Sequence, residues 1–280
     1  MDLKKINMDK IREFSHHSPI LFSLAFTLLT VLSNETFSML FRLLPENTWR
    51  DILYDVLGIL WPVALAVIFG FGFIFRKRGF RASIGAALPV FLLYGIVLVS
   101  QVGIMADNPD TPWKSELEIF QGILMLLGIG IREEILFRGV ITNAIVRKYG
   151  TTAKGLWVTV LSAGAMFGAV HLANVLHGAS FTGALVQAIG AVAGGVLYCA
   201  VYLRSGSIWG VALLHSLEDT PAYVTMLFTN APENLSAAAM ISSYRLSPTQ
   251  IMFIVCDLLL AAFLLRKSKQ QKVFDRFQQA

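Results

Sequence analysis

The chain has 280 residues, of which 55% are hydrophobic and only 15% are charged, and its formal net charge is +5. Soluble domains carry about 25% charged residues, so this composition excludes an ordinary soluble domain and favours a chain that lies in a lipid bilayer. The two cysteines, Cys199 and Cys256, lie inside apolar runs without the spacing of a metal or disulfide motif, so we interpret both as packing residues.

Eight apolar segments of membrane-spanning length follow one another along the chain. A transmembrane helix needs about 20 mostly apolar residues. The candidate spans are residues 19–41, 53–75, 84–105, 118–146, 155–176, 182–203, 207–229 and 249–265. The first is too long and, at Asn34 and Glu35, too polar for a cleaved signal peptide, so we interpret it as a retained anchor. We therefore expect an all-α, polytopic membrane protein with about eight transmembrane helices.

Lysine and arginine are distributed unevenly between the two sets of loops that these spans define. With the N-terminus in the cytoplasm, the inside segments hold 17 of the 23 Lys and Arg residues and the outside loops hold 4. The inside segments are residues 1–18, 76–83, 147–154, 204–206 and 266–280. Because basic residues stay on the cytoplasmic side, we expect a multi-pass protein of the cell membrane with both termini cytoplasmic. We interpret the basic tail as an anchor of this kind and expect no contact with nucleic acid.

No linker and no repeat of fixed period divides the chain. We expect one integral membrane domain, in which residues 1–105 act as a scaffold or gate and residues 106–280 carry the motifs described below, the last span and the basic tail. In the sixth span, Gly190 and Gly194 are four residues apart, a spacing that favours close packing between helices.

Ionisable residues within the spans are costly, so each is a candidate for function. Glu35 lies near the expected outer interface, and Asp257 stands alone on the last span, so both have simple structural explanations. No role can be assigned from the sequence to these two residues or to Glu218.

The stretch "GIREEILFRGV", residues 130–140, places two carboxylates side by side within the fourth span. Glu134 and Arg138 are four residues apart, so they share a helix face and are expected to pair. Glu133 points about 100° away from that face. One carboxylate is therefore neutralised by its own helix and the other is left free, while Arg132 is expected to face elsewhere.

Two further patterns place histidines within spans. "FGAVH" puts Phe167 and His171 on one helix face, and "HSLED" does the same for His215 and Asp219. Each pattern alone has a structural alternative. From the expected inner boundary, however, Glu133, His171, His215 and Asp219 lie about 21, 25, 14 and 20 Å along their helices. In a hydrocarbon core of about 30 Å, these four groups are expected to meet at one level.

Taken together, Glu-Glu-x-x-x-Arg, Phe-x-x-x-His and His-x-x-x-Asn/Asp on three spans in this order resemble the CPBP (Abi) intramembrane endopeptidases, relatives of the CAAX-prenyl protease. The resemblance covers about residues 115–225. It implies an intramembrane catalytic cavity, hydrolysis of a peptide bond and a substrate that is a peptide or membrane protein. It does not identify that substrate, and the oligomeric state is not readable.

Carried over by position, the resemblance makes Glu133 the carboxylate that activates water and His171 its partner. Glu134, Arg138 and Phe167 support the site. His215 and Asp219 stabilise the oxyanion. The family often has Asn where this chain has Asp219, and because an ionised carboxylate donates no hydrogen bond, Asp219 is expected either to be protonated or to orient His215.

Alternatives from different classes stay open at this stage. Glu, His and Asp are acceptable zinc ligands, so the same scaffold could be a zinc-dependent protease, although no His-Glu-x-x-His motif is present and the expected mechanism needs no cofactor. A non-catalytic role, as a bacteriocin-immunity protein, another membrane binding protein or a transporter, is the second alternative. A transporter would be expected to have related halves, and none is recognisable in the sequence.

Overall fold

The structure is a computed structural model that describes residues 8–76, 78–107, 113–230 and 236–278. The regular secondary structure of these residues is helical throughout, and the β-structure they contain is an isolated bridge between Trp113 and Thr229. This confirms the all-α prediction. The α-helices are α1 (Met8–His17), α2 (Pro19–Phe41), α3 (Thr48–Ile68), α4 (Phe80–Ala106), α5 (Glu116–Glu134), α6 (Asn143–Tyr149), α7 (Ala153–Val170), α8 (Phe181–Ser205), α9 (Ile208–Phe228), α10 (Ala237–Ser242), α11 (Pro248–Leu264) and α12 (Lys267–Gln278). The other helical segments are the 3-10 helix η2 (Gly72–Phe75), the π-helix η3 (Ile135–Thr142) and the 3-10 helix η4 (His171–His177).

Polar side chains fix the starts of the helices that carry the site. Ser115 and Glu118 form a reciprocal capping box at the start of α5, which satisfies two backbone N–H groups of its first turn. Ser180 and Ser207 each accept a hydrogen bond from a backbone N–H in the first turn of α8 and α9. These helices therefore begin at defined residues, which sets the register of the polar side chains further along them.

Five described helices are long and apolar enough to cross a membrane: α2, α3, α4, α7 together with η4, and α8. A sixth is added if α11 and α12, which meet at a bend of 71°, count as one span. The chain is thus described as a multi-pass membrane protein, while the predicted number of eight spans stays a prediction. The remaining two predicted spans, at α5 to α6 and at α9, are helical but carry the acidic and basic residues of the first and third motifs.

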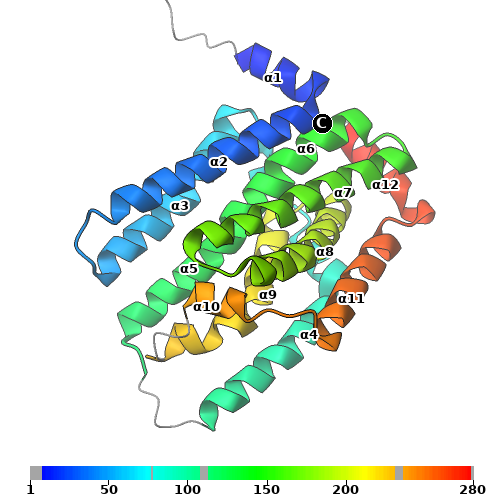
Figure 1. The fold of residues 1–280 in the computed structure, drawn as a ribbon. Coiled ribbons are helices and arrows are strands. Elements are labelled where there is room, and N and C mark those ends of the chain that lie inside the picture. Colours follow the sequence, from blue (N-terminus) through cyan, green and yellow to red (C-terminus); the bar gives the residue numbers. More distant parts are fainter. Residues whose placement is uncertain (1–7, 77, 108–112, 231–235, 279–280) are drawn as a thin grey trace, which may run out of the picture.

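The helices are arranged around α8, which lies in the middle of the bundle (Figure 1). In its most apolar stretch, 67% of α8 is buried, against 17% for α4 at the periphery. Helix α8 packs against α7, α11 and α4, whereas α5 packs between α3 and α9. The motif-bearing segments α5, η3, α7 and α9 therefore belong to the inner part of the molecule, and the N-terminal helices α2, α3 and α4 expose apolar side chains on their outer faces.

The close helix contact predicted at Gly190 and Gly194 lies elsewhere. A Cβ atom at Gly190 would meet nothing within 4 Å, and at Gly194 only ordinary contacts. The tight approach is made by the neighbouring Gly195, where a Cβ would lie 2.9 Å from the Cα of Gly164 on α7. The spacing rule identified the correct helix but the wrong face, because the face with Gly190 and Gly194 borders a cavity.

The described parts of all five segments predicted to be cytoplasmic lie at one end of the bundle. The Lys148 amine donates to the His17 carbonyl, and α12 contacts both α6 and α8. Arg204 Nη1 donates to the Lys269 carbonyl at 3.1 Å, and Gly79 lies against the backbone of Ser205. Figure 1 shows α1 and the chain's C-terminus at this end. The segments thus share one side of the bundle, and the assignment of that side to the cytoplasm stays a prediction.

Candidate functional site

A buried ion pair on the first motif forms the base of the site. Arg138 Nη1 lies 2.8 Å from Glu134 Oε1, and neither side chain has exposed surface, which confirms the predicted pairing. The guanidinium carbon lies 4.5 Å from the ring centre of Phe167 and 5.2 Å from that of Tyr198, so the cation also faces two aromatic rings. Its Nη2 donates to the Gly195 carbonyl at 3.3 Å. The arginine therefore connects the first motif to α7 and α8.

The helix that carries the first motif changes its winding directly after Glu134. The sequence predicted one continuous span over residues 118–146, whereas the structure has α5, the π-helix η3 and then α6. The wide turns of a π-helix leave carbonyl groups without their usual partners. Side chains at the end of η3 satisfy them: Thr142 Oγ1 donates to the Phe137 carbonyl at 2.8 Å, and Asn143 Nδ2 donates to the Gly139 carbonyl at 2.7 Å. The irregular segment is thus stabilised locally beside the site.

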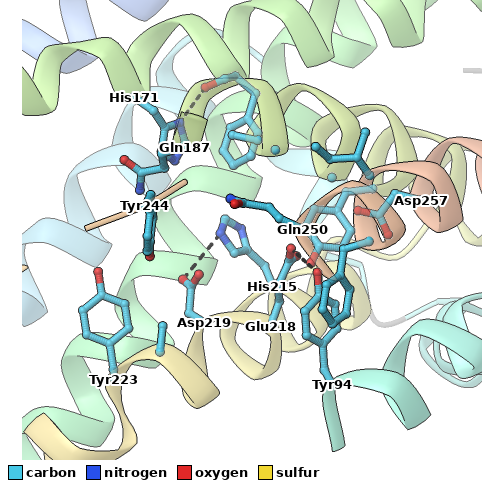
Figure 2. A pocket seen from close by; sticks show the side chains of 18 residues that line it. Tyr94, His171, Gln187, His215, Glu218, Asp219, Tyr223, Tyr244, Gln250 and Asp257 are labelled. Carbon is cyan, nitrogen blue, oxygen red and sulfur yellow. Dashed lines mark hydrogen bonds and ion pairs between the residues drawn. The ribbon is translucent and has the colours of Figure 1, made fainter. Parts of the chain in front are cut away.

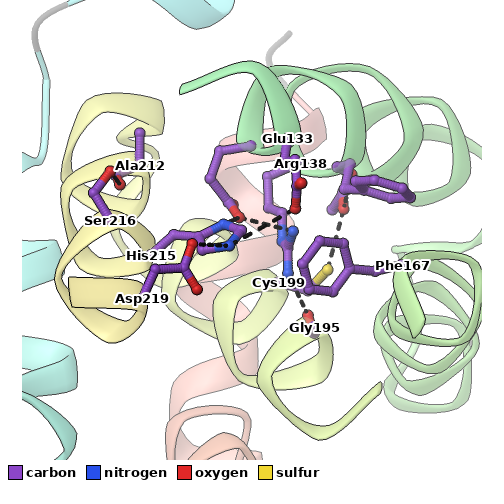
Figure 3. A network of polar contacts seen from close by, with 12 residues as sticks. Glu133, Arg138, Phe167, Gly195, Cys199, Ala212, His215, Ser216 and Asp219 are labelled. Atoms are coloured by element: carbon purple, nitrogen blue, oxygen red, sulfur yellow. Dashed lines mark hydrogen bonds and ion pairs between the residues drawn. The ribbon is translucent and has the colours of Figure 1, made fainter. Parts of the chain in front are cut away.

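His215 on α9 contacts both adjacent glutamates of the first motif. Figure 3 shows its ring next to Glu133 and Asp219. Its Nδ1 lies 2.8 Å from Glu134 Oε1, and because the paired carboxylate accepts, this nitrogen carries a proton. Its Nε2 lies 3.7 Å from Glu133 Oε2 and 3.6 Å from Asp219 Oδ2, both longer than a hydrogen bond. Glu134 therefore holds the ring, and the second ring nitrogen is directed toward two further carboxyl groups.

The contact between His215 and the first motif requires a close approach of α5 and α9, which Gly130 provides. A Cβ atom at this position would lie 2.3 Å from Ser216 Oγ and 2.6 Å from the Ala212 carbonyl oxygen. No side chain fits there, so the two helices touch through backbone one turn away from Glu134. Gly130 is therefore required for the close packing of α5 against α9, which the motif pattern alone did not predict.

His171 stands where α7 ends and the 3-10 helix η4 begins. Its Nδ1 lies 2.8 Å from the Phe167 carbonyl oxygen, and since a carbonyl only accepts, Nδ1 carries the proton and Nε2 has the free lone pair. The Phe167 ring lies edge-on to both histidines, with centroid distances of 4.9 Å to His171 and 5.6 Å to His215. Phe167 therefore separates and orients the two imidazoles.

The four residues predicted to do the chemistry border one cavity of about 230 Å³. Glu133, His171, His215 and Asp219 contribute to its wall from α5, the start of η4 and α9. Glu133 has 28% of its side chain exposed, whereas Glu134 has none. The Oε2 atom of each glutamate makes no hydrogen bond, and Glu134 is held through its Oε1. The structure thus brings together the groups that the depth argument predicted to meet.

The expectation that Arg132 faces away from this region was wrong. Arg132 borders the same cavity as Glu133, and both also border an adjoining cavity of about 250 Å³. In this second cavity Glu35 lies 3.1 Å from His177 Nε2, so Glu35 has a partner on η4. The position of Arg132 was not predicted from helical geometry, because the two cavities adjoin each other and both adjacent side chains, at residues 132 and 133, border them.

Several polar residues of the site were missed at the sequence level. Asn174 Nδ2 donates to Gln187 Oε1 at 2.7 Å, and both side chains border the cavity with Tyr223. Amide side chains are uncommon within membrane spans, so Asn174 and Gln187 could have been recognised as candidate site residues from the sequence. The role of Glu218 was left open, and its Oε1 accepts from the Tyr94 hydroxyl at 2.6 Å beside the site. Tyr94 lies 124 residues away in sequence, so no local pattern connects the two.

Among the described residues, no group of three or more His, Cys, Asp or Glu side chains has the arrangement to hold a metal ion. The two cysteines are free, as expected, and Cys199 is buried with its Sγ 3.2 Å from Thr142 Oγ1.

Fold and site together define a class: an all-helical, multi-pass membrane protein with carboxylates and histidines gathered around a cavity between its inner helices. Residues 115–220 match the family model described as Rce1-like, Type II CAAX prenyl endopeptidase Rce1-like. The matched region contains all three motifs, so the resemblance to the CPBP endopeptidases is confirmed over this part of the chain. No curated protein and no solved structure matches the chain.

Proposed function

We propose that this protein is an intramembrane endopeptidase of the glutamic type, which hydrolyses a peptide bond in a membrane-associated protein or peptide precursor. The observation that carries the proposal is the shared cavity, which the partly exposed Glu133 borders together with His171 and His215. The family match over the three motifs supports the reaction class. The family model is named for CAAX prenyl endopeptidases, whose name refers to prenylated substrates. For this chain the proposal covers peptide precursors, leaders and membrane proteins, with or without a prenyl group.

The attacking water is held between Glu133 and His171. Glu133 is partly exposed, as a general base that must reach water has to be, whereas Glu134 is fully buried and engaged by Arg138 and His215. The fixed tautomer of His171 leaves its Nε2 to accept a hydrogen bond from the same water. Glu133 takes one proton as the water oxygen bonds to the scissile carbonyl carbon.

His215 stabilises the oxyanion that this attack creates. With Nδ1–H donated to Glu134, only the doubly protonated ring has a second N–H, and the nearby carboxyl groups of Glu133 and Asp219 favour that charged form. Its Nε2–H then donates to the carbonyl oxygen as negative charge develops there. When the C–N bond breaks, the proton held by Glu133 passes to the leaving amine.

Glu134 has the orienting role that the sequence interpretation considered for Asp219. The carboxylate of Glu134 contacts Nδ1 at 2.8 Å, while Asp219 lies 3.6 Å from Nε2 on the cavity side. We propose that Asp219 contributes by favouring the protonated imidazole rather than by donating to the oxyanion. The Asn common at this position in the family would donate instead.

The mechanism uses no metal ion, and the zinc-dependent protease is its alternative. Its ligands would have to come from Glu133, His171, His215 and Asp219, which border the cavity but do not have the arrangement of a metal site in this structure. Cleavage that persists in chelator supports the glutamic mechanism. Inhibition by chelator with recovery on addition of zinc would assign the site to a metal.

Replacement of the general base tests the proposal. Glu133→Gln keeps the shape and polarity of the side chain but removes the base, so we expect normal insertion and a loss of turnover of about a hundredfold or more. His171→Ala should lose activity similarly, and the double variant should lose little more, because both groups act on one water. The measurement is cleavage of a quenched peptide or of a native precursor in detergent or liposomes.

Glu116→Gln is the matched control, since it changes an exposed carboxylate at the start of the same helix and should retain activity. Turnover of Glu133→Gln at the wild-type rate would exclude the glutamic mechanism. A wild-type protein that binds a peptide without cleaving it would instead favour the non-catalytic, immunity-type function.

A further inference from the structure

A second group of acidic residues lies beside the catalytic residues, in a cavity of about 270 Å³ that the mechanism leaves unexplained. Glu218 on α9 and Asp257 on α11 both border it, and the Tyr94 hydroxyl donates to Glu218 at 2.6 Å. Figure 2 shows the carboxyl groups of Glu218 and Asp257 on the side of the cavity opposite Tyr223. The two acids come from different helices, so the fold rather than a local motif brings them together.

The cavity has a buried polar group without a partner. Asp257 is only 3% exposed, and its Oδ1 makes no hydrogen bond. An acid at such a position in a membrane protein is costly unless a partner compensates it. Of the described residues that border the cavity, none is Lys or Arg, and the imidazole of His215, which also borders it, has its close contacts with Glu133, Glu134 and Asp219 rather than with Asp257. The missing partner is therefore expected to come from a ligand.

The remaining walls suit a long, positively charged side chain. Tyr94 and Phe253 stack with ring centres 5.0 Å apart, and aromatic rings attract cations through their faces. Gly190 and Gly194 also line the cavity; a Cβ atom at Gly194 would lie 3.7 Å from Glu218 Oε1, and one at Gly190 would meet nothing within 4 Å. This open, flat side leaves room for a chain of methylene groups that ends at the carboxyl groups.

The acidic cavity adjoins the catalytic one. His171, His215 and Asp219 border both cavities, with Glu133 on one side of them and Glu218 and Asp257 on the other. A peptide whose scissile bond lies at His215 would thus place a neighbouring side chain toward the acids.

We infer that this cavity is a specificity subsite, which binds the ammonium or guanidinium group of a Lys or Arg residue next to the scissile bond of the substrate. The inference deepens the proposed function and rests on it, because the bound peptide is a substrate only if the protein is an endopeptidase. The binding of a basic side chain is argued from the cavity alone. Glu218, held by Tyr94, and Asp257 are the residues that determine specificity.

The test uses N-acetylated peptide pools of apolar residues with one central Lys, Arg, norleucine or Glu, added to the full chain in detergent. Acetylation removes the terminal amine as a competing cation. We expect wild type to cleave the Lys or Arg pool at least about tenfold faster than the norleucine pool, in line with a charged hydrogen bond. Asp257→Asn and Glu218→Gln should each reduce this preference to about threefold or less.

Two further variants make the result specific. Gly190→Leu fills the cavity without changing its acids and should also abolish the basic preference. Asp55→Asn is the matched control, because Asp55 is a buried span acid on α3 that accepts from Gln121 at 2.9 Å and does not border this cavity. Its preference should equal that of wild type.

Equilibrium dialysis of the same pools against Glu133→Gln separates this inference from the proposed function. Preferential binding of basic pools that is lost with an added Asp257→Asn supports the subsite, even if wild type cleaves nothing. Equal binding of basic and norleucine pools, or a basic preference that survives both acid substitutions and Gly190→Leu, would overturn it.

Discussion

At the scale of single residues, Arg138 is the most constrained side chain of the site. It has no exposed surface, its charge is balanced by Glu134, and its guanidinium faces the Phe167 ring. Glu134 in turn holds His215, so one arginine fixes the position of a group that the proposed mechanism uses. The carboxylate pair differs in environment more than in sequence: Glu134 is enclosed, whereas Glu133 reaches the cavity.

We predict that Arg138→Ala destabilises the protein. Removal of one partner of a buried ion pair costs about 3–5 kcal/mol, because the other charge stays buried without compensation. The variant should therefore show lower expression and a lower melting temperature in detergent, measured by thermal unfolding. Arg245→Ala, at an exposed arginine that contacts only backbone carbonyls, is the control and should melt like wild type. A stable but inactive Arg138→Ala protein would instead assign the arginine a direct part in the reaction.

At the scale of elements, the contact between α5 and α9 determines whether the motifs meet. This contact is narrow because Gly130 lies against the backbone of α9 at Ala212. Ala212 and His215 are less than one turn apart, so any displacement of α9 at this point also moves the histidine away from Glu134.

We predict that Gly130→Ala lowers the rate of peptide cleavage by more than its loss of folding stability can explain. The added methyl group would overlap Ser216 Oγ and the Ala212 carbonyl oxygen, and overpacking of this kind costs about 1–3 kcal/mol and shifts the backbone. Peptide cleavage and thermal unfolding should be measured on the same preparation. Gly95→Ala on α4, where a Cβ meets nothing within 4 Å, should behave like wild type.

Ser216→Ala removes one of the two overlapping atoms and should restore part of the activity lost in Gly130→Ala. Full activity of Gly130→Ala without the second change would show that the helix contact has more tolerance than the structure implies.

The elements also show where inference from the sequence ends. A spacing of four residues predicted the Glu134–Arg138 pair and the proximity of His215 to Asp219, because each depends on one stretch of helix. The π-helix after Glu134 was missed, since it is stabilised by the side chains of Thr142 and Asn143 rather than by apolar periodicity.

Contacts between helices that are distant in sequence also could not be predicted from the sequence. The hydrogen bond from Tyr94 to Glu218 joins residues 124 positions apart, and the face of α8 that packs closely was not readable from its many small residues. The agreement in depth of Glu133 with His171 and His215 did predict one shared cavity, because depth in a membrane is a coordinate that hydropathy and charge supply.

At the scale of the whole molecule, basic residues are concentrated at one end of the bundle. The described parts of the chain segments that carry 17 of the 23 Lys and Arg residues belong to this end, and ordered contacts join them, as between Arg204 Nη1 and the Lys269 carbonyl at 3.1 Å. At the other end, the Lys114 amine donates to the Met226 carbonyl at 2.7 Å. Such a polarity in charge is what orients a multi-pass protein during insertion.

We predict that the basic end is cytoplasmic, and single cysteines test it without a change in Lys or Arg. Gln271→Cys lies on an exposed position of α12 at the basic end, and Glu46→Cys lies at the opposite end, where the native side chain is 92% exposed. A membrane-impermeant maleimide should label Glu46→Cys in intact cells but Gln271→Cys only after permeabilisation. The unsubstituted chain, with buried Cys199 and half-buried Cys256, gives the background signal. Labelling of Gln271→Cys in intact cells would invert the topology, and the cavity that we propose to be catalytic would then have to receive its substrates from the opposite side of the membrane.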